Sequence, residues 1–358
     1  MNIGFNSSIN RNLSKAEYNY YKIYYLNLEK YYLSWYLPVI IFVGIIGGIV
    51  CGIFLIISKI FPKNVLIWML SICIGDLMIL LFDALRMLFK MWFRFDIRDL
   101  TLTSCKLHNF LSNYFFYWSG YMQACMSIQR LICILKPLQA KRIFTNKLVF
   151  SVWTFVTIIL TGPMLPYLLY WKLLDDNDVK DCSPIHDNLY SLITILDMTI
   201  LGIIPLLTMI TSTIGISVVV FKSSSEVGIL ASQSQSLVGS TSRQRAQHNN
   251  DNAWHVTRLL ISMNILYFVS NFPLLIYQIY LNAGGNKVNK SIPQQLHKTI
   301  YYTLRSFCYL SSSWNWVFYC AGGNQFRNHA LKMIHRLNCF QKQDRQVETQ
   351  TKLINLSL

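Results

Sequence analysis

Long apolar stretches alternate with short polar segments along the whole chain. Each stretch reaches the length of about 20 residues that a helix needs to cross the hydrocarbon layer of a bilayer. The pattern therefore predicts an all-α membrane protein, a bundle of seven transmembrane helices within residues 33–322. The seven stretches lie at about 33–58, 64–90, 107–135, 147–171, 189–221, 254–281 and 299–322.

Two segments outside the predicted spans have a distinct composition. Residues 222–252 are rich in Ser, Gln and Asn, which predicts a flexible cytoplasmic loop. Over residues 323–337, apolar positions recur at helical spacing with basic residues between them, as in an amphipathic helix on a membrane surface. Residues 338–358 then form a cytoplasmic tail. The apolar positions of the amphipathic segment are Phe326, Ala330, Met333, Ile334 and Leu337.

Composition and charge agree with a membrane protein. Of 358 residues, 53% are apolar and 13% charged, whereas about 25% of a typical soluble domain is charged. The net charge of +16 is dispersed over short loops, which favours contact with a lipid bilayer over binding of nucleic acid. We expect residues 1–32 outside the cell, and a slight excess of Lys and Arg in the segments assigned to the cytoplasm agrees with that orientation. In that orientation the sequons at Asn6 and Asn12 are glycosylation sites.

Two of the nine cysteines stand apart from the rest. Most cysteines lie inside predicted spans, where a thiol behaves as a small apolar group. Cys105 and Cys182 instead fall in predicted exterior segments, where disulfides persist. A bridge between them would hold the acidic loop that contains Cys182 over the bundle, and two unpaired thiols are the alternative.

A semi-polar stripe follows one face of the third predicted span, at positions three or four residues apart. Such a face is unfavourable against lipid, so we expect it to face the bundle interior. A polar seam between packed helices would explain its serines but not Arg130, because an isolated charge there costs about 3 kcal/mol. The stripe comprises Ser112, Phe116, Ser119, Gln123, Ser127 and Arg130. The other ionisable residues inside the spans are Asp76, Asp83, Arg86, Asp197 and Arg305.

Several motifs stand in register along these spans, and together they resemble the rhodopsin-like G-protein-coupled receptors. The resemblance runs from about residue 33 to residue 337. It implies a receptor in the plasma membrane with an extracellular N-terminus, which signals through a heterotrimeric G protein and binds kinases and arrestin. The motifs are "SIQRLICILKPL" around Arg130, Cys105 before the third span, Asp76 in "SICIGDL", Trp153, Pro205 in "GIIPLL", Pro273 in "SNFPLL", and Asn315 with Tyr319 in "NWVFY".

The resemblance implies roles for individual residues. Arg130 would lie at the cytoplasmic end of the third span and contact the G protein once the sixth span swings outward, and it can reach the interface by snorkelling. Cys105 and Cys182 would form a disulfide. Asp76, Ser119 and Asn315 would gather around a sodium ion, and a protonated, hydrogen-bonded Asp76 without an ion is the alternative. The remaining coupling and switch positions are Gln129, Pro137, Pro273, Asn315 and Tyr319.

Some positions depart from the family pattern. Gln129 stands where the family has an acid that holds the arginine in the resting state, so we expect weak restraint of that state and some signalling without ligand. Gly48 stands in place of an asparagine partner of Asp76, within a glycine-rich segment that permits close helix packing. The other departures are Leu131, Thr213, Asn271 and Trp316.

The ligand is expected to be a short peptide. Ser112 occupies the place where amine receptors carry an aspartate, and the last span has no lysine for a retinal Schiff base. Mixed charge and aromatic surface in the outer half suit a peptide, and the acidic loop would attract a basic one. The predicted ligand-binding residues are Asp83, Arg86, His108, Asn109, Ser112, Phe116, Asp197, Gln278 and Arg305.

The sixth and seventh spans are similar to those of invertebrate neuropeptide receptors of the FMRFamide-like kind. That resemblance implies an amidated ligand that ends in Arg-Phe-amide. Asp197 or Asp83 would pair with the ligand arginine. Asp83 lies three residues before Arg86 on one helix, so the alternative for Asp83 is neutralisation by that neighbour.

Other functions fit the sequence less well. It has no "HExxH" motif and no recognisable pair of nucleophile and base, so we expect no enzymatic activity and no cofactor beyond the sodium ion. A transporter would often show an internal repeat, and none is visible in the sequence. A class A receptor for a non-peptide ligand and a decoy receptor that binds ligand without coupling stay open.

Overall fold

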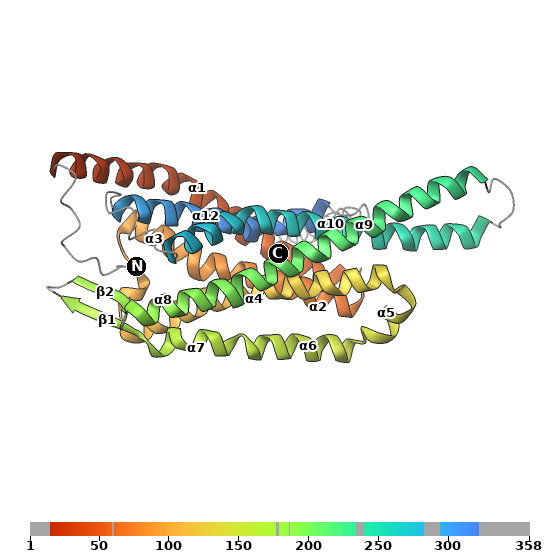
Figure 1. Cartoon of the computed structure of the whole chain (residues 1–358), viewed down its shortest axis with the longest axis horizontal. Helices are drawn as coiled ribbons and strands as arrows, with labels where there is room; N and C mark the ends of the chain where they lie inside the picture. Colours follow the sequence, from red (N-terminus) through yellow and green to blue (C-terminus); the bar gives the residue numbers. More distant parts are fainter. Residues whose placement is uncertain are drawn as a thin grey trace, which may run out of the picture.

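The structure is a computed structural model that describes residues 15–58, 61–176, 179–185, 187–233, 240–282 and 294–321. In these residues seven helical columns run along one another, as the apolar pattern predicts (Figure 1). The columns are α1 (Lys15–Ser58); α2 (Lys63–Ile79) continued by the π-helical turn η1 (Leu80–Ala84) and α3 (Leu85–Phe93); α4 (Leu102–Leu135); α6 (Asn146–Ile159) with α7 (Thr161–Leu169); α8 (Asp187–Leu196) continued by the π-helical turn η3 (Asp197–Ile203) and α9 (Ile204–Gln233); α10 (Ser240–Tyr280); and α12 (Gln294–Ala321).

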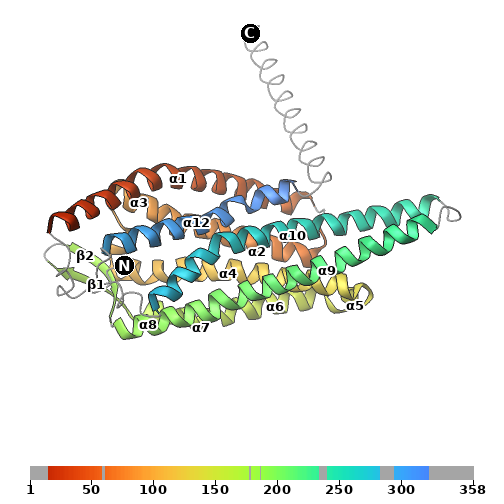
Figure 2. The ribbon, with the colours of Figure 1, turned by 45° about the horizontal axis from the view of Figure 1, so that its top comes forward.

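Five of the columns contain segments long and apolar enough to cross a membrane. The other two, α4 and α12, carry many buried polar side chains, which lowers their hydropathy. A polar helix is stable in a bilayer when its polar groups face other helices. Helix α4 packs against α2, α7 and α9, and α12 packs against α1, α2 and α10 (Figure 2). The five apolar segments are Ser34–Ile57, Lys63–Phe93, Asn146–Leu169, Leu192–Val219 and Thr257–Tyr280.

Glycines allow α1 to approach α12 closely. A Cβ atom at Gly47 would overlap the indole ring of Trp316, and one at Gly44 would lie 2.7 Å from the Cβ atom of Ser313. Trp316 therefore fills a notch on α1 that exists because Gly47 has no side chain. This agrees with the close packing expected from the glycine-rich segment around Gly48.

A β-hairpin covers one end of the bundle, and we call this the hairpin end (Figure 1). Strands β1 (Trp171–Asp176) and β2 (Val179–Pro184) pair in antiparallel fashion, with Leu173 opposite Cys182. Cys182 forms a disulfide with Cys105 near the start of α4, with 5.6 Å between the Cα atoms. The predicted bridge is confirmed, whereas the hairpin itself was not expected from the sequence.

At the opposite end, α9 and α10 continue side by side beyond the other helices (Figures 1 and 2). Much of the segment predicted as a loop, residues 222–252, is helical, because α9 ends at Gln233 and α10 begins at Ser240. This segment contains no proline that would stop either helix. The predicted glycosylation sites Asn6 and Asn12, the amphipathic helix 323–337 and the tail 338–358 lie outside the described residues.

Candidate functional site

The carboxylate of Asp83 is surrounded by hydrogen-bond donors. It lies in η1, a π-helical turn of a kind often found at functional sites. Arg305 Nε of α12 donates to Asp83 Oδ2 at 2.7 Å, and Arg305 Nη2 lies 2.6 Å from the same oxygen. The Tyr309 hydroxyl donates to the same oxygen at 2.9 Å. Arg86 Nη2 is 3.5 Å from Oδ1, so both oxygens of Asp83 are engaged and Arg305 is its closest partner.

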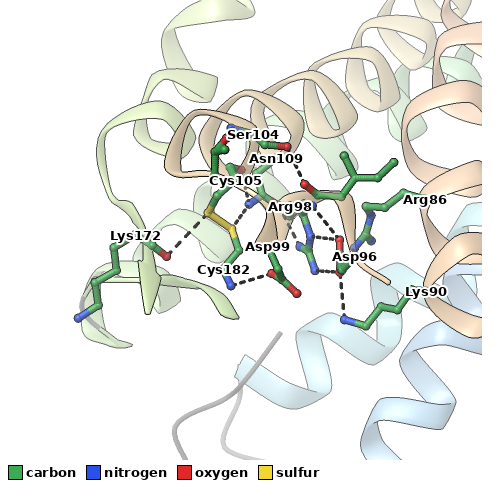
Figure 3. Close-up of a disulfide and its surroundings, with 12 residues drawn as sticks. Arg86, Lys90, Asp96, Arg98, Asp99, Ser104, Cys105, Asn109, Lys172 and Cys182 are labelled. Atoms are coloured by element: carbon green, nitrogen blue, oxygen red, sulfur yellow. Dashed lines mark hydrogen bonds and ion pairs between the residues drawn. A yellow bond between two sulfur atoms is a disulfide. The ribbon is translucent and has the colours of Figure 1, made fainter. Parts of the chain in front are cut away.

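A second ion cluster lies around Asp96, just beyond the end of α3 (Figure 3). Arg86 Nη1 and Lys90 Nζ each lie 3.1 Å from Asp96 Oδ2, and Arg98 Nη2 lies 2.9 Å from it. Burial acts to raise the pKa of Asp96, but the hydrogen bonds from Arg98 and the charges of Arg86 and Lys90 outweigh it and hold this pKa well below its usual range. Asp96 therefore stays ionised and ties the connection between α3 and α4 to the bundle.

Three predicted ligand-binding residues of α4 are bonded to neighbours in the structure. Asn109 accepts a hydrogen bond from Arg98 Nη1 at 3.1 Å, and its Nδ2 lies 3.1 Å from the Cys182 sulfur. Ser112 Oγ lies 3.1 Å from His108 Nδ1, one helical turn away. All three side chains are buried. They stabilise the hairpin end and do not line the cavity described next.

Four other predicted residues meet at one cavity between α4, η3, α10 and α12. They are Phe116, Asp197, Gln278 and Arg305. The volume open to the centres of water molecules is about 40 Å³. Arg305 lies over the Phe116 ring, with 4.2 Å between its guanidinium carbon and the ring centroid, a cation–π contact. The cavity therefore has a carboxylate on one side and a guanidinium on another.

Asp197 lines this cavity, and one of its carboxylate oxygens is unpaired among the described residues. It lies in η3, the second π-helical turn, and its side chain is buried. Its Oδ2 accepts a hydrogen bond from the Tyr167 hydroxyl, whereas Oδ1 has no hydrogen-bond partner among the described residues. An unpaired buried carboxylate oxygen is costly, so a cationic group that donated a hydrogen bond to Oδ1 would stabilise Asp197.

Asp76 lies deeper in the bundle, in α2. Its Oδ1 accepts from Ser119 Oγ at 2.9 Å, and its Oδ2 accepts from Asn315 Nδ2 at 2.7 Å. Asn315 Oδ1 has no partner among the described residues, and a cavity of about 10 Å³ adjoins it. Hard oxygen atoms suit a sodium ion, so Asp76, Ser119 and Asn315 fit one. They also fit a hydrogen-bonded Asp76 alone, and the sodium site stays a prediction.

Arg130 lies near the end of α4 that is opposite the hairpin. No carboxylate pairs with it among the side chains that the structure describes, and its Nε has no acceptor there. Gln129 accepts a hydrogen bond from the indole N–H of Trp68 in α2, so it does not restrain Arg130. Of the other switch positions, Pro137 begins α5 (Pro137–Ile143), Pro273 lies inside α10, and Tyr319 is buried.

Sequence reasoning missed several residues of these sites. Tyr167 and Tyr309 bind the two candidate carboxylates, and Tyr267 and Asn271 line the cavity. Tyr167 is 30 residues from Asp197 and Tyr309 is 226 residues from Asp83, so no local pattern marks either pair. The Asp96 cluster does leave a local signal, the short charged segment "FRFDIRD".

The comparisons with known proteins agree with this architecture. The sequence profile of the family described as 7 transmembrane receptor (rhodopsin family) matches residues 26–319, which is most of the chain. No curated protein matches the chain. The match extends into all seven helical columns and includes the disulfide and the residues of both cavities, and the chain therefore belongs to the rhodopsin family of seven-transmembrane receptors.

Proposed function

We propose that this receptor binds a short, basic, amidated peptide at the hairpin end of the bundle. As a member of its family it is a multi-pass membrane receptor, not an enzyme, which binds a ligand and couples to a G protein. The proposal concerns the ligand, a plasma-membrane location with the N-terminus outside, and binding of kinases and arrestin at the opposite end. The observation that supports the ligand part of the proposal is the unpaired Oδ1 of Asp197.

The chemistry of the cavity supports a cationic ligand group. A buried carboxylate oxygen without a donor gains most from a guanidinium or ammonium group. Tyr267 and Phe116 offer aromatic surface beside it. The cavity is small, so it would take one side chain of the ligand, with the rest of the peptide toward the hairpin. Arg305 would face an oxygen atom of the ligand.

The resemblance to FMRFamide-like receptors makes Arg-Phe-amide peptides the first ligands to test. Asp197→Asn is expected to weaken binding of an active peptide about 5–150-fold, because the ligand arginine loses its charged partner at a cost of about 1–3 kcal/mol. Asparagine can still accept the hydrogen bond from Tyr167. Competition binding on membranes at matched receptor density measures the change.

A neutral ligand sharpens this experiment. Citrulline has nearly the shape of arginine without its charge, so a citrulline peptide should bind Asp197→Asn and the unaltered receptor equally. Thr199→Val is a matched control, since Thr199 is exposed and its hydroxyl donates to carbonyl oxygens of its own helix. Equal arginine-peptide affinity for Asp197→Asn and the unaltered receptor would remove Asp197 from the site. Activation by non-peptide ligands alone would favour a non-peptide receptor. Peptide binding without nucleotide exchange on a G protein would favour a decoy receptor, and solute flux in liposomes would favour a transporter.

Gln129 provides a test of basal signalling. Gln129→Glu is expected to lower ligand-independent signalling about fivefold, because a carboxylate beside Arg130 adds an ion pair of about 1 kcal/mol to the resting state. Glutamate also keeps an acceptor for Trp68. The measurement compares calcium and cyclic-nucleotide levels in transfected cells at equal surface expression.

Gln129→Met separates charge from the hydrogen bond, because it removes the acceptor for Trp68 without adding a carboxylate. Methionine should therefore not lower the basal signal. Unchanged or higher output from Gln129→Glu would refute the expectation that a missing acid weakens the resting state.

A further inference from the structure

Asn264 joins three helices through its buried side chain. Its Nδ2 lies 3.0 Å from Ser127 Oγ in α4 and 2.9 Å from Thr213 Oγ1 in α9. Its Oδ1 accepts from Gln123 Nε2 of α4 at 3.1 Å. We call Gln123, Ser127, Thr213 and Asn264 the Asn264 cluster. Gln123 and Ser127 have no exposed surface, and Asn264 is 4% exposed.

Every partner of Asn264 in this cluster lies on another helix. Its hydrogen bonds therefore depend on the position of α10 relative to α4 and α9. The cluster lies between the ligand cavity and Arg130. If this part of α10 moves away from α4, the Asn264 amide must leave its partners. An amide in a membrane interior has no bulk water to replace them, so the cluster opposes that movement.

The usual restraint on such a movement is missing at the adjacent end of α4. Arg130 has no carboxylate partner among the described side chains, and Gln129 is bonded to Trp68 of α2. Neither residue links α4 to α10 in the described contacts. In this half of the bundle, Asn264 links α10 to α4 through its hydrogen bonds with Gln123 and Ser127.

We propose that Asn264 is a positioning residue that holds α10 against α4 and α9 in the resting receptor and thereby sets the level of basal signalling. Its amide bonds Gln123 and Ser127 on α4 and Thr213 on α9. The cluster is thus a polar latch, a set of buried hydrogen bonds that restrains α10. It does so in place of an ion pair between Arg130 and a neighbouring acid. This inference requires that the receptor couples to a G protein, as members of its family do. It does not require that the ligand is a peptide.

Two variants test the latch. Asn264→Leu keeps similar volume and removes all the hydrogen bonds, and Thr213→Val is nearly isosteric and removes one. An interhelical hydrogen bond in a membrane protein shifts such an equilibrium about threefold, so Thr213→Val should raise basal nucleotide exchange about threefold and Asn264→Leu up to about tenfold. The double variant should not exceed Asn264→Leu alone. Ser262→Ala is the control, because the Ser262 hydroxyl donates to the backbone carbonyl of Arg258 in its own helix.

A distance measurement removes dependence on the choice of G protein. Spin labels at Leu138→Cys in α5 and Arg258→Cys in α10, both exposed positions, report the separation of α10 from the α4 end. Asn264→Leu and Thr213→Val should each enlarge the population at longer distance without ligand. An unchanged distance distribution in both variants, or an equal effect of Ser262→Ala, would overturn the proposal. Failure of every peptide in the binding experiments would leave this result intact.

Discussion

Asp83→Asn is expected to lower the free energy of unfolding by about 3–5 kcal/mol, the usual cost of removing one partner from a buried ion pair. The change leaves the guanidinium of Arg305 buried without its carboxylate, and Arg86 loses one of its two acidic partners. The thermal midpoint of the purified receptor in nanodiscs, together with surface expression, measures the loss.

Two further variants identify the cause. Tyr309→Phe removes only a neutral hydrogen-bond donor from Asp83 and should cost about 1 kcal/mol. Asp83→Asn combined with Arg305→Gln removes both charges and should recover much of the stability lost in the single variant, because no unpaired charge remains. A single variant as stable as the unaltered receptor, or a double variant that loses the sum of both effects, would contradict this account.

Cys182→Ser is expected to lower the free energy of unfolding by about 2–5 kcal/mol, as for other native disulfides. The bridge joins residues 77 apart and fixes the β1–β2 hairpin to the start of α4. The buried Cys182 backbone N–H also donates to Asp99 Oδ1 at 3.0 Å, so the hairpin is tied to the neighbouring connection as well. Loss of the bridge should therefore also weaken ligand binding at this end.

Cysteine variants elsewhere serve as controls for this prediction. Cys105→Ser should match Cys182→Ser, and the double variant should be no less stable than either. Cys125→Ser should have little effect, because Cys125 is a free thiol in the middle of α4. Equal thermal midpoints of Cys182→Ser and the unaltered receptor under oxidising conditions would show that the bridge does not stabilise the fold.

The helical columns were predictable because the thickness of a bilayer sets a length that an apolar stretch must reach. The stripe on the third span was also predictable. A helix repeats every three or four residues, so Ser112, Ser119, Gln123 and Ser127 had to share a face, and all four are buried. What the stripe does could not be read from spacing. Only the position of α10 shows that two of these residues bind Asn264.

The candidate site was predictable only in part. Phe116, Asp197, Gln278 and Arg305, which the sequence analysis predicts as ligand-binding residues, line one cavity. The partner of Asp83 was harder to assign, because Arg86 lies one turn away in sequence whereas Arg305 is 222 residues away. Local spacing favours the near neighbour, and long-range helix packing determined the closer contact. The hairpin was missed for a related reason, since a short strand pair leaves little signal beside long apolar stretches.

The notch on α1 has a consequence for how the chain can change over time. The indole of Trp316 occupies the space that any side chain at Gly47 would need, and a smaller residue at Trp316 would leave that space empty. A larger residue at position 47 alone would therefore clash with the indole, and a smaller residue at position 316 alone would leave a void. The two sites are bound to evolve as a pair, with a larger residue at one accepted only when the other becomes smaller.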